Sequence, residues 1–270
     1  MPELPEVETT LRGVAPHLVG KTITEIDIRE RRLRWPVPKV IDGLAGSEFL
    51  AARRRGKYLL FEVGGGTIIL HLGMSGGLRV LDPEVEWKKH DHLALRLSSG
   101  KELRYHDPRR FGCVLFQKGD PESHALLKEL GPEPLEDEFS AGYLVDAAKG
   151  RKVAIKQLIM NSKIVVGVGN IYACEALYLA RINPTREAGK VSRAKLAKLV
   201  DAIRSVLGAA IESGGTTLRD FLNEDGQPGY FKQSLHVYGR EGEECRGCGG
   251  KVKRIVQGQR STFYCEKCQR

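Results

Sequence analysis

Residues 245–268 read CRGCGGKVKRIVQGQRSTFYCEKC, a segment with a C-x2-C pair at each end. Two such pairs at this separation can supply four thiolates to one tetrahedral zinc ion. Two disulfides are the alternative, but disulfides are rare in a reducing compartment. Between the pairs, 251–256 and 260–264 have the pattern of two strands joined by a turn around Gly258. The segment therefore predicts a basic β-hairpin with one structural zinc ion, bound by Cys245, Cys248, Cys265 and Cys268.

The charge of the whole chain agrees with a basic hairpin. Its 270 residues include 43 Lys and Arg against 34 Asp and Glu, a net charge of +9. An excess of this size favours a polyanionic partner, with nucleic acid ahead of an anionic membrane surface. No apolar run reaches membrane-spanning length, and the N-terminus is acidic where a signal peptide is basic and then apolar. We therefore expect a cytosolic protein that binds no membrane.

Upstream of the hairpin the chain divides into a β-rich part and a helical part. Short strand-like runs at 58–63, 67–72, 92–97 and 103–106 have spacings that suit an antiparallel sandwich. The segment 131–138 contains two prolines and few apolar residues, which is typical of a linker. Beyond it, apolar residues from Leu196 to Ala210 keep helical spacing, and Gly214-Gly215 is expected to stop that helix.

The stretch Gly167-Val-Gly-Asn170-Ile-Tyr172 lies in the helical part. A dinucleotide-binding fingerprint needs a glycine where Tyr172 stands and a strand before it, whereas 155–160 has a helical pattern. That interpretation is rejected. We expect Asn170 to cap a new helix whose free backbone amides face one phosphate. The alternative is a tight turn between helices that binds no ligand.

Two glycine-containing loops carry side chains suited to distorting DNA. HLGMSG (71–76) places Met74 between glycines, and DPRRFG (107–112) places Arg109 and Phe111 after a turn-forming Asp-Pro. Apolar wedges and an arginine can occupy the gap left by an extruded base. The alternative is that Met74 and Phe111 belong to the core and Arg109 is an ordinary surface cation.

The chain begins Met1-Pro2-Glu3-Leu4-Pro5-Glu6. Removal of Met1 would expose a secondary amine beside several carboxylates. An α-amino group has a reference pKa of about 7.7 to 8, so part of it is unprotonated near neutrality and can act as a nucleophile, with Glu3 or Glu6 moving protons. The alternative is structural, with Pro5 in the first turn of a helix and the acids complementing its dipole.

Taken together, these features resemble one known family. In order along the chain come the Pro2–Glu8 terminus, the basic stretch 53–58, the two loops, VVGVGNIY (165–172), GGTT (214–217) and the four-cysteine hairpin. The set is similar to the bacterial formamidopyrimidine-DNA glycosylases (Fpg/MutM), bifunctional enzymes that remove 8-oxoguanine and ring-opened purines. The resemblance extends from Pro2 to Cys268. The related endonuclease VIII branch typically begins Pro-Glu-Gly-Pro, so Leu4 favours the purine branch.

The resemblance implies an α+β fold. It consists of an N-terminal antiparallel β-sandwich with flanking helices, a C-terminal helical domain with a helix-two-turn-helix motif, and a β-hairpin zinc finger. We expect the sandwich domain at 1–131, a linker at 132–150, the helical DNA-binding domain at 151–235 and the zinc finger at 236–270.

The resemblance also implies a mechanism. Pro2 would attack the sugar and form a Schiff base, Glu3 would protonate the opening sugar, and Glu6 and Glu175 would order their surroundings. Strand cleavage by β,δ-elimination would follow. A loop at 217–230 would close over the lesion. The residues expected to act in catalysis are Pro2, Glu3, Glu6, Lys57 and Arg260, and those expected to contact DNA are His71, Met74, His90, Arg109, Phe111, Lys156, Asn170, Tyr238 and Arg260.

The implied partner is double-stranded DNA with an oxidised purine or an abasic site, bound by a monomer in the bacterial cytoplasm at the nucleoid. Two departures from the family are Asn161, where many relatives have Asp, and Cys174, often Asp or Ser. Asn161 removes a carboxylate that would support the following turn or handle protons. Two other classes compete with this assignment, an endonuclease VIII-like pyrimidine glycosylase and a non-enzymatic zinc-ribbon protein, and the latter leaves the Pro-Glu terminus unexplained.

Overall fold

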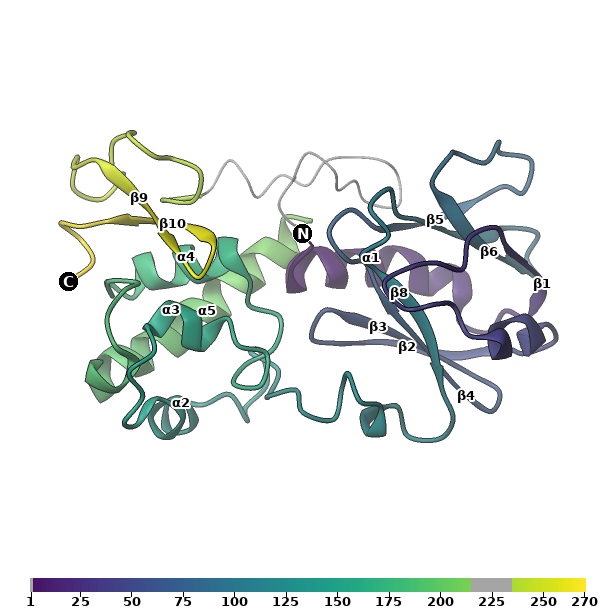
Figure 1. Cartoon of the computed structure of the whole chain (residues 1–270), viewed down its shortest axis with the longest axis horizontal. Coiled ribbons are helices and arrows are strands. Elements are labelled where there is room, and N and C mark those ends of the chain that lie inside the picture. Colours follow the sequence, from purple (N-terminus) through teal and green to yellow (C-terminus); the bar gives the residue numbers. More distant parts are fainter. Residues whose placement is uncertain (1, 215–234) are drawn as a thin grey trace. The chain divides into compact units, whose positions relative to one another are not determined.

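The computed structural model describes residues 2–214 and 235–270, which form two compact units (Figure 1). Among the described residues, unit 1 contains 2–129 with 213–214, and unit 2 contains 130–212 with 235–270. Met1 and the loop expected at 217–230 lie outside the described residues.

Unit 1 is an antiparallel β-sandwich of two four-stranded sheets. This confirms the sandwich predicted from the sequence. One sheet has the order β1-β6-β7-β5, formed by Ile23–Ile28, Asp91–Leu97, Glu102–His106 and Gly77–Leu81. The other has the order β2-β3-β4-β8, formed by Phe49–Arg55, Tyr58–Val63, Gly66–His71 and Cys113–Gln117.

Apolar side chains from both sheets share one core, which helix α1 extends. Leu4, Val7, Leu11, Val14 and Leu18 recur every three or four residues along α1 (Leu4–Leu18) and are all buried. The helix contacts β2 and β3 of one sheet and β5 of the other. Its first turn, which carries the expected chemistry, is therefore anchored to the sandwich. The short 3-10 helices η1 (Lys39–Leu44) and η2 (Pro121–Ser123) complete the unit.

Unit 2 combines helices with a terminal hairpin. It contains α2 (Ala141–Ala148), α3 (Ile155–Ile159), α4 (Asn170–Leu179), η3 (Ala188–Lys190), α5 (Arg193–Glu212), and strands β9 (Val252–Gln257) and β10 (Arg260–Cys265). α4 contacts α3, α5 and β10, so it is the central element of the unit. The predicted helix around 196–210 is confirmed as α5, and Gly214 beyond its end has φ +73°. The expected linker range 132–150 contains α2, which Ser140 caps through its Oγ.

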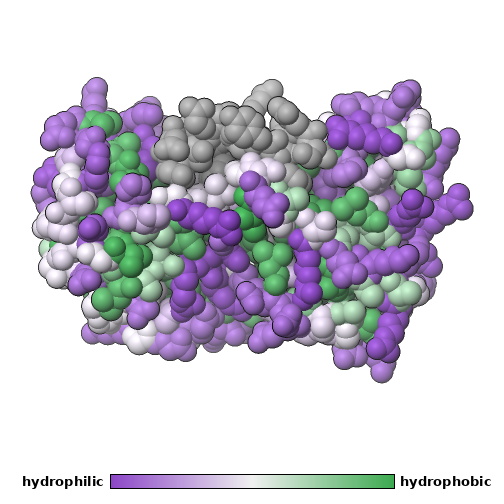
Figure 2. All heavy atoms as spheres, turned by 180° about the vertical axis from the view of Figure 1, so that it is seen from behind, coloured by the Kyte–Doolittle hydropathy of each residue, from purple (hydrophilic) through white to green (hydrophobic). Residues whose placement is uncertain are grey.

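Hydrophilic residues predominate on the face shown in Figure 2, with hydrophobic residues in scattered groups between them. Within the described parts of the chain, no helix combines the length and the apolar character needed to cross a membrane.

Candidate active site and nucleic-acid interface

The N-terminal residues lead directly into α1. Pro2 is buried, and the exposed fractions of Glu3 and Glu6 are 3% and 0%. Glu3 and Glu6 form a capping box, in which the N–H of Glu3 donates to Oε2 of Glu6 at 2.8 Å. Pro5 lies in the first turn, so the structural interpretation of this terminus is correct. It is also compatible with the chemical one, because the cap fixes two carboxylates next to Pro2.

Lys57 and His71 lie on the sheet formed by β2, β3, β4 and β8. Lys57 occupies the tight β2–β3 turn after Gly56, and His71 ends β4. The N–H of Gly73 donates to Nδ1 of His71 at 2.9 Å, which leaves the ring hydrogen on Nε2. Burial, followed by the positive charges of Lys57 and Arg34, lowers the pKa of His71 to about 4. The imidazole is therefore neutral at pH 7 and offers one N–H donor.

The two predicted DNA-distorting loops are neighbours in unit 1. The β4–β5 connection carries Met74, which is 38% exposed, and the β7–β8 connection carries Phe111, which is 46% exposed. The alternative that these two side chains belong to the core is therefore wrong. Arg109 is also exposed, with its guanidinium carbon 4.8 Å from the centre of the Phe111 ring. The three side chains form a mixed apolar and cationic group on the surface.

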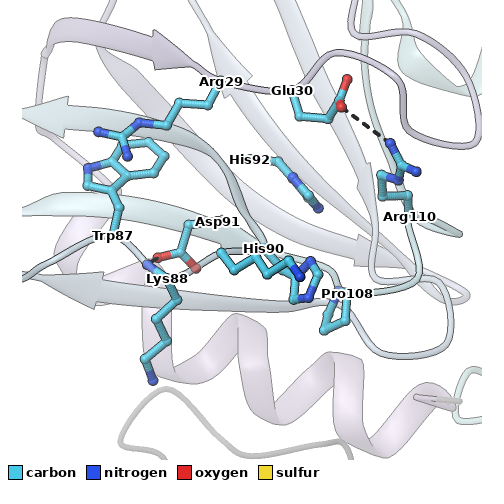
Figure 3. A pocket seen from close by; sticks show the side chains of 10 residues that line it. Arg29, Glu30, Trp87, Lys88, His90, Asp91, His92, Pro108 and Arg110 are labelled. Atoms are coloured by element: carbon cyan, nitrogen blue, oxygen red, sulfur yellow. Dashed lines mark hydrogen bonds and ion pairs between the residues drawn. The ribbon is translucent and has the colours of Figure 1, made fainter.

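The β7–β8 loop also contributes Pro108 and Arg110 to the lining of a pocket of about 460 Å³ (Figure 3). Its lining includes the cationic residues Arg29, Lys88, Lys89 and Arg110 and the histidines His90 and His92. Both acids in the lining are paired, Glu30 with Arg110 at 3.2 Å and Asp91 with His106 at 2.7 Å. The pocket therefore presents an excess of positive charge, which suits a phosphate backbone.

In unit 2, Asn170 begins α4 but does not cap it. Gly169 is the N-cap residue, and the Asn170 side chain instead accepts a hydrogen bond from Nζ of Lys156 at 2.6 Å and donates one to the Ser261 carbonyl at 2.9 Å. The predicted capping role is therefore wrong. The Asn170 side chain instead makes hydrogen bonds to Lys156 and Ser261, which are distant in the sequence. Lys156 is 1% exposed and also donates to Oγ1 of Thr262 at 2.6 Å. These contacts tie the start of α4 to the hairpin.

Glu175 of α4 holds the segment 236–238 in place. Its exposed fraction is 2%, and its two oxygens accept hydrogen bonds from the backbone N–H groups of His236 (2.7 Å), Val237 (2.9 Å) and Tyr238 (2.8 Å). Nδ1 of His236 lies 3.1 Å from the same carboxylate. The Tyr238 ring packs edge-on against Phe263, with 5.0 Å between ring centres. Tyr238 is thus fixed by both its backbone and its ring.

The four cysteines of the hairpin form one cluster. Their sulfur atoms all lie within 4.8 Å of one another, with Cys245 and Cys268 at 3.8 Å and Cys248 and Cys265 at 3.5 Å. Four thiolates about 2.3 Å from a tetrahedral zinc ion lie about 3.8 Å apart, so the cluster fits zinc. Tyr178 of α4 lies with its hydroxyl 3.4 Å from Sγ of Cys245. The predicted strands 251–256 and 260–264 are confirmed as β9 and β10.

The hairpin turn presents Arg260 to solvent. Gly258 and Gln259 between the strands have φ of +56° and +60°, which is typical of a tight two-residue hairpin turn. Arg260 begins β10 opposite Gln257 and is exposed. The turn predicted around Gly258 is confirmed.

Each expected site residue falls into one of two groups. Unit 1 carries Pro2, Glu3, Glu6, Lys57, His71, Met74, His90, Arg109 and Phe111, and unit 2 carries Lys156, Asn170, Glu175, Tyr238, Arg260 and the four cysteines. Within each unit, residues far apart in the sequence converge, as Lys156 and Thr262 do.

The two departures from the family pattern have different environments. Asn161 is exposed and accepts a hydrogen bond from the Lys163 N–H at 3.0 Å, so its amide oxygen supports the turn after α3. Cys174 is 1% exposed and packs with Tyr178, Val237 and Phe263 in the core beneath the hairpin.

Sequence reasoning missed several supporting residues. Asp107 was considered only as a turn former, yet it is completely buried and accepts four hydrogen bonds from neighbouring groups. Thr262, also completely buried, receives Lys156. The available signal was positional, because each is a small polar residue two positions from a residue expected to bind DNA, Arg109 and Arg260 respectively.

Comparison with known families assigns three parts of the chain. Residues 1–114 match the model of the formamidopyrimidine-DNA glycosylase N-terminal domain, 130–222 match the formamidopyrimidine-DNA glycosylase H2TH domain, and 242–270 match a zinc finger found in FPG and IleRS. The chain belongs to the formamidopyrimidine-DNA glycosylase family. Fpg proteins are bifunctional DNA glycosylases and AP lyases that remove oxidised purines.

Individual relatives agree over the full length. The chain is 58% identical to formamidopyrimidine-DNA glycosylase of Thioalkalivibrio sulfidiphilus and 56% identical to that of Alcanivorax borkumensis, covering 100% of both chains in each case. Its fold matches the crystal structure of MutM (Fpg) from Thermus thermophilus with a TM-score of 0.90 at 39% identity, covering 99% of this chain and 98% of that one. A MutM structure in complex with carbocyclic 8-oxo-G containing DNA matches with a TM-score of 0.92 at 34% identity, covering 100% of both chains. The zinc-finger match and the four-cysteine cluster are together consistent with one structural zinc ion per chain.

Proposed function

We propose that this Fpg-family chain extrudes an oxidised purine from duplex DNA, removes it with the amine of Pro2 as nucleophile, and then cleaves the strand. One observation supports this proposal above the others. Pro2 stands at the start of α1 beside Glu3 and Glu6, which are buried and held by a capping box. The capping box uses both carboxylates to start the helix, and the same contacts hold them next to the amine that removal of Met1 would expose.

The covalent step begins after Met1 has been removed. The Pro2 nitrogen attacks C1′ of the damaged nucleotide, the bond from C1′ to the base breaks, and the base leaves with the proton that the nitrogen gives up. Protonation of O4′ by Glu3 opens the sugar ring, so the nitrogen and C1′ form an iminium. The iminium makes the C2′ proton acidic. Loss of that proton expels the 3′ phosphate, and a second elimination expels the 5′ phosphate.

The basic and polar groups are assigned to the DNA backbone. Lys57, neutral His71, Asn170, Tyr238 and Arg260 would bind phosphates around the kink, with Lys156 and His90 adding to the same field. Such contacts supply affinity and register, whereas the choice of base comes from elsewhere. The fixed positions of Asn170 and Tyr238 within unit 2 support this role.

Met74, Arg109 and Phe111 are assigned to the gap in the duplex. Met74 would fill the space left by the extruded base, Phe111 would wedge the opposite strand, and Arg109 would donate hydrogen bonds to the orphan base. Arginine offers only donors, so it suits the acceptors of cytosine. The exposure of all three side chains supports this role.

The zinc ion is assigned a structural role. Cys245, Cys248, Cys265 and Cys268 supply four thiolates, which leave no coordination position for an activated water. The ion would hold the base of the hairpin and thereby the position of Arg260.

We also propose an oligomeric state, a cellular location and domain bounds for the chain. The chain would act as a monomer in the bacterial cytoplasm on DNA with an oxidised purine or an abasic site. Its four parts would be 1–131, 132–150, 151–235 and 236–270.

Covalent trapping and a substrate panel test the proposed function. Lesion DNA treated with the protein and borohydride is expected to yield a covalent complex, and an uncleaved N-terminal tag is expected to abolish it. Pro2→Gly keeps a terminal amine and is expected to retain weak trapping. DNA binding without any trapping would instead identify a non-enzymatic zinc-ribbon protein. Faster excision of oxidised pyrimidines than of 8-oxoguanine would favour the endonuclease VIII-like alternative.

A further inference from the structure

One buried carboxylate connects the two loops that carry the exposed wedge residues. Asp107 is 0% exposed, and its Oδ1 accepts a hydrogen bond from Oγ of Ser75 at 2.9 Å. Its Oδ2 accepts from the N–H of Gly112 at 2.9 Å and from the hydroxyl of Tyr105 at 3.1 Å. Ser75 follows Met74 directly, and Gly112 follows Phe111 directly. The carboxylate therefore spans from the residue after one wedge to the residue after the other.

The backbone at Arg109 is held by the same pair of residues. Its N–H lies 3.3 Å from Oδ1 of Asp107 and 3.3 Å from Oγ of Ser75. The Ser75 hydroxyl donates to Asp107 and accepts from Arg109. All three residues expected to enter the duplex thus emerge from backbone fixed by Asp107 and Ser75.

The two loops also touch directly through glycines. A Cβ atom placed on Gly73 would lie 2.4 Å from the Gly112 nitrogen, and one placed on Gly112 would lie 2.3 Å from the His71 carbonyl oxygen at the start of the other loop. Neither contact is compatible with a side chain, so the loops approach as closely as bare backbone permits. Because the two loops are in direct contact, the donors from Ser75 and Gly112 lie at fixed positions around the Asp107 carboxylate.

The main chain of Asp107 is fixed to the sheet independently of its carboxylate. Its N–H donates to the His90 carbonyl at 3.0 Å. Nε2 of His92, which is 4% exposed, lies 2.7 Å from the Asp107 carbonyl oxygen. Removal of the carboxylate is therefore expected to free the two loops and leave the attachment of Asp107 to strand β6 intact.

We propose that Asp107 is a positioning residue that holds Met74, Arg109 and Phe111 in one arrangement before DNA binds. The inference rests on the proposed function, since it assigns these three side chains to the gap in the duplex. Asp107 touches neither the sugar nor the base. It acts through the loops by removing their freedom to move independently, so that insertion of Met74 and Phe111 and recognition by Arg109 occur together.

Asp107→Asn tests this role because it keeps the size of the side chain and replaces one acceptor oxygen with a donor. Single-turnover excision of 8-oxoguanine opposite cytosine is expected to fall by about tenfold or more, because a displacement of about 1 Å costs on the order of 100-fold. The ratio of excision opposite cytosine to that opposite adenine is expected to fall toward one. Elimination at a preformed abasic site, where no base is extruded, is expected to change by less than about threefold.

Ser75→Ala is the second variant, because it removes the two hydrogen bonds that the Ser75 hydroxyl makes between the loops, to Asp107 and from Arg109, and leaves Asp107 with its other donors. Ser75→Ala is expected to lower the ratio of excision opposite cytosine to that opposite adenine by a smaller factor than Asp107→Asn does. Glu102→Gln is the matched control. Glu102 lies at the other end of β7, is 1% exposed, and accepts a hydrogen bond from Nε of Arg104 at 2.7 Å. It is expected to leave the ratio unchanged even if it lowers the melting temperature.

A fluorescent adenine analogue placed next to the orphan cytosine on the undamaged strand provides a readout that a purely structural role would not move. Its fluorescence reports wedge insertion, which is expected to become slower in Asp107→Asn and Ser75→Ala and to stay unchanged in Glu102→Gln. Normal insertion and a normal ratio in both loop variants would overturn the inference. If Arg109→Ala also leaves the ratio unchanged, the assignment of Arg109 in the proposed function fails instead.

Discussion

Glu175→Gln is expected to destabilise unit 2 strongly, although it changes only one atom of the side chain. In the native site one carboxylate oxygen accepts from the N–H groups of Val237 and Tyr238, and the other accepts from His236 N–H and lies 3.1 Å from Nδ1 of His236. Because a carboxylate only accepts, we assign the ring hydrogen of His236 to Nδ1, so each oxygen accepts two hydrogen bonds. An amide nitrogen in place of either oxygen faces two donors. Neither orientation of the glutamine amide avoids this conflict, because both oxygens are fully used.

The size of the effect follows from the two hydrogen bonds that are lost. A hydrogen bond to a charged group contributes about 1.5 to 3 kcal/mol, so the loss of two predicts a decrease of about 3 to 6 kcal/mol in the free energy of unfolding. The free energy of unfolding of a natural domain is about 5 to 15 kcal/mol in total. The variant is therefore expected to be partly unfolded at modest denaturant concentrations. Tyr238 is held by this carboxylate, so DNA affinity is expected to fall as well.

Urea denaturation followed by circular dichroism measures the change, with Glu187→Gln as control. Glu187 is in the same unit, and its side chain is 40% exposed in an ion pair with Lys190, so its loss is expected to cost less than about 1 kcal/mol. Both variants replace a glutamate with glutamine, at a buried position in Glu175→Gln and at a partly exposed position in Glu187→Gln. A decrease below about 1 kcal/mol for Glu175→Gln would refute the argument that its carboxylate is needed to hold 236–238.

Three further predictions concern His71, Cys248 and Arg109. The pKa of His71 is lowered from 6.5 to about 4 in the folded state, so the unfolded chain binds more protons between these values and stability falls as pH falls from 6.5 to 4. The loss is up to about 3 kcal/mol, and His71→Gln should remove it, as measured by denaturation at a series of pH values. Cys248→Ser is expected to lose zinc and to weaken DNA binding through the hairpin, and metal analysis that still finds one zinc ion per chain would contradict the ligand assignment. Arg109→Ala is expected to reduce the preference for cytosine over adenine opposite the lesion, which is about tenfold or more if one good base contact contributes 1 to 3 kcal/mol; single-turnover rates on both pairings measure it.

The strands that the sequence predicted share a position in the sheets. β3, β4, β6 and β7 are the interior strands of the two sheets, whereas β1, β2, β5 and β8 lie at the edges. Interior strands contact the core along most of their length, and all residues of β4 except the first and the last are buried. The edge strand β2 has a buried residue only at its start. Weak apolar patterning at the edges follows from their one-sided packing, so the sandwich was predictable and its borders were not.

The site shows the same division between local and tertiary information. The zinc ligands and the hairpin turn at Gly258 were predictable because their signals lie within a short segment. Asn170 was misjudged because a capping preference is local, whereas Lys156 and Ser261 reach it from elsewhere in the chain. Asp107 was missed for a related reason, since its partner Ser75 is 32 residues away and no periodicity links the two.

The central claim is that the covalent nucleophile is the nitrogen of Pro2, and mass mapping of the reduced adduct tests it most directly. The protein is incubated with duplex DNA containing 8-oxoguanine opposite cytosine, reduced with borohydride, digested, and analysed by tandem mass spectrometry. The account predicts one adduct, on the N-terminal peptide that begins at Pro2 and lacks Met1. An equally abundant adduct on Lys57 or Lys156, or trapping by protein that retains Met1, would contradict it.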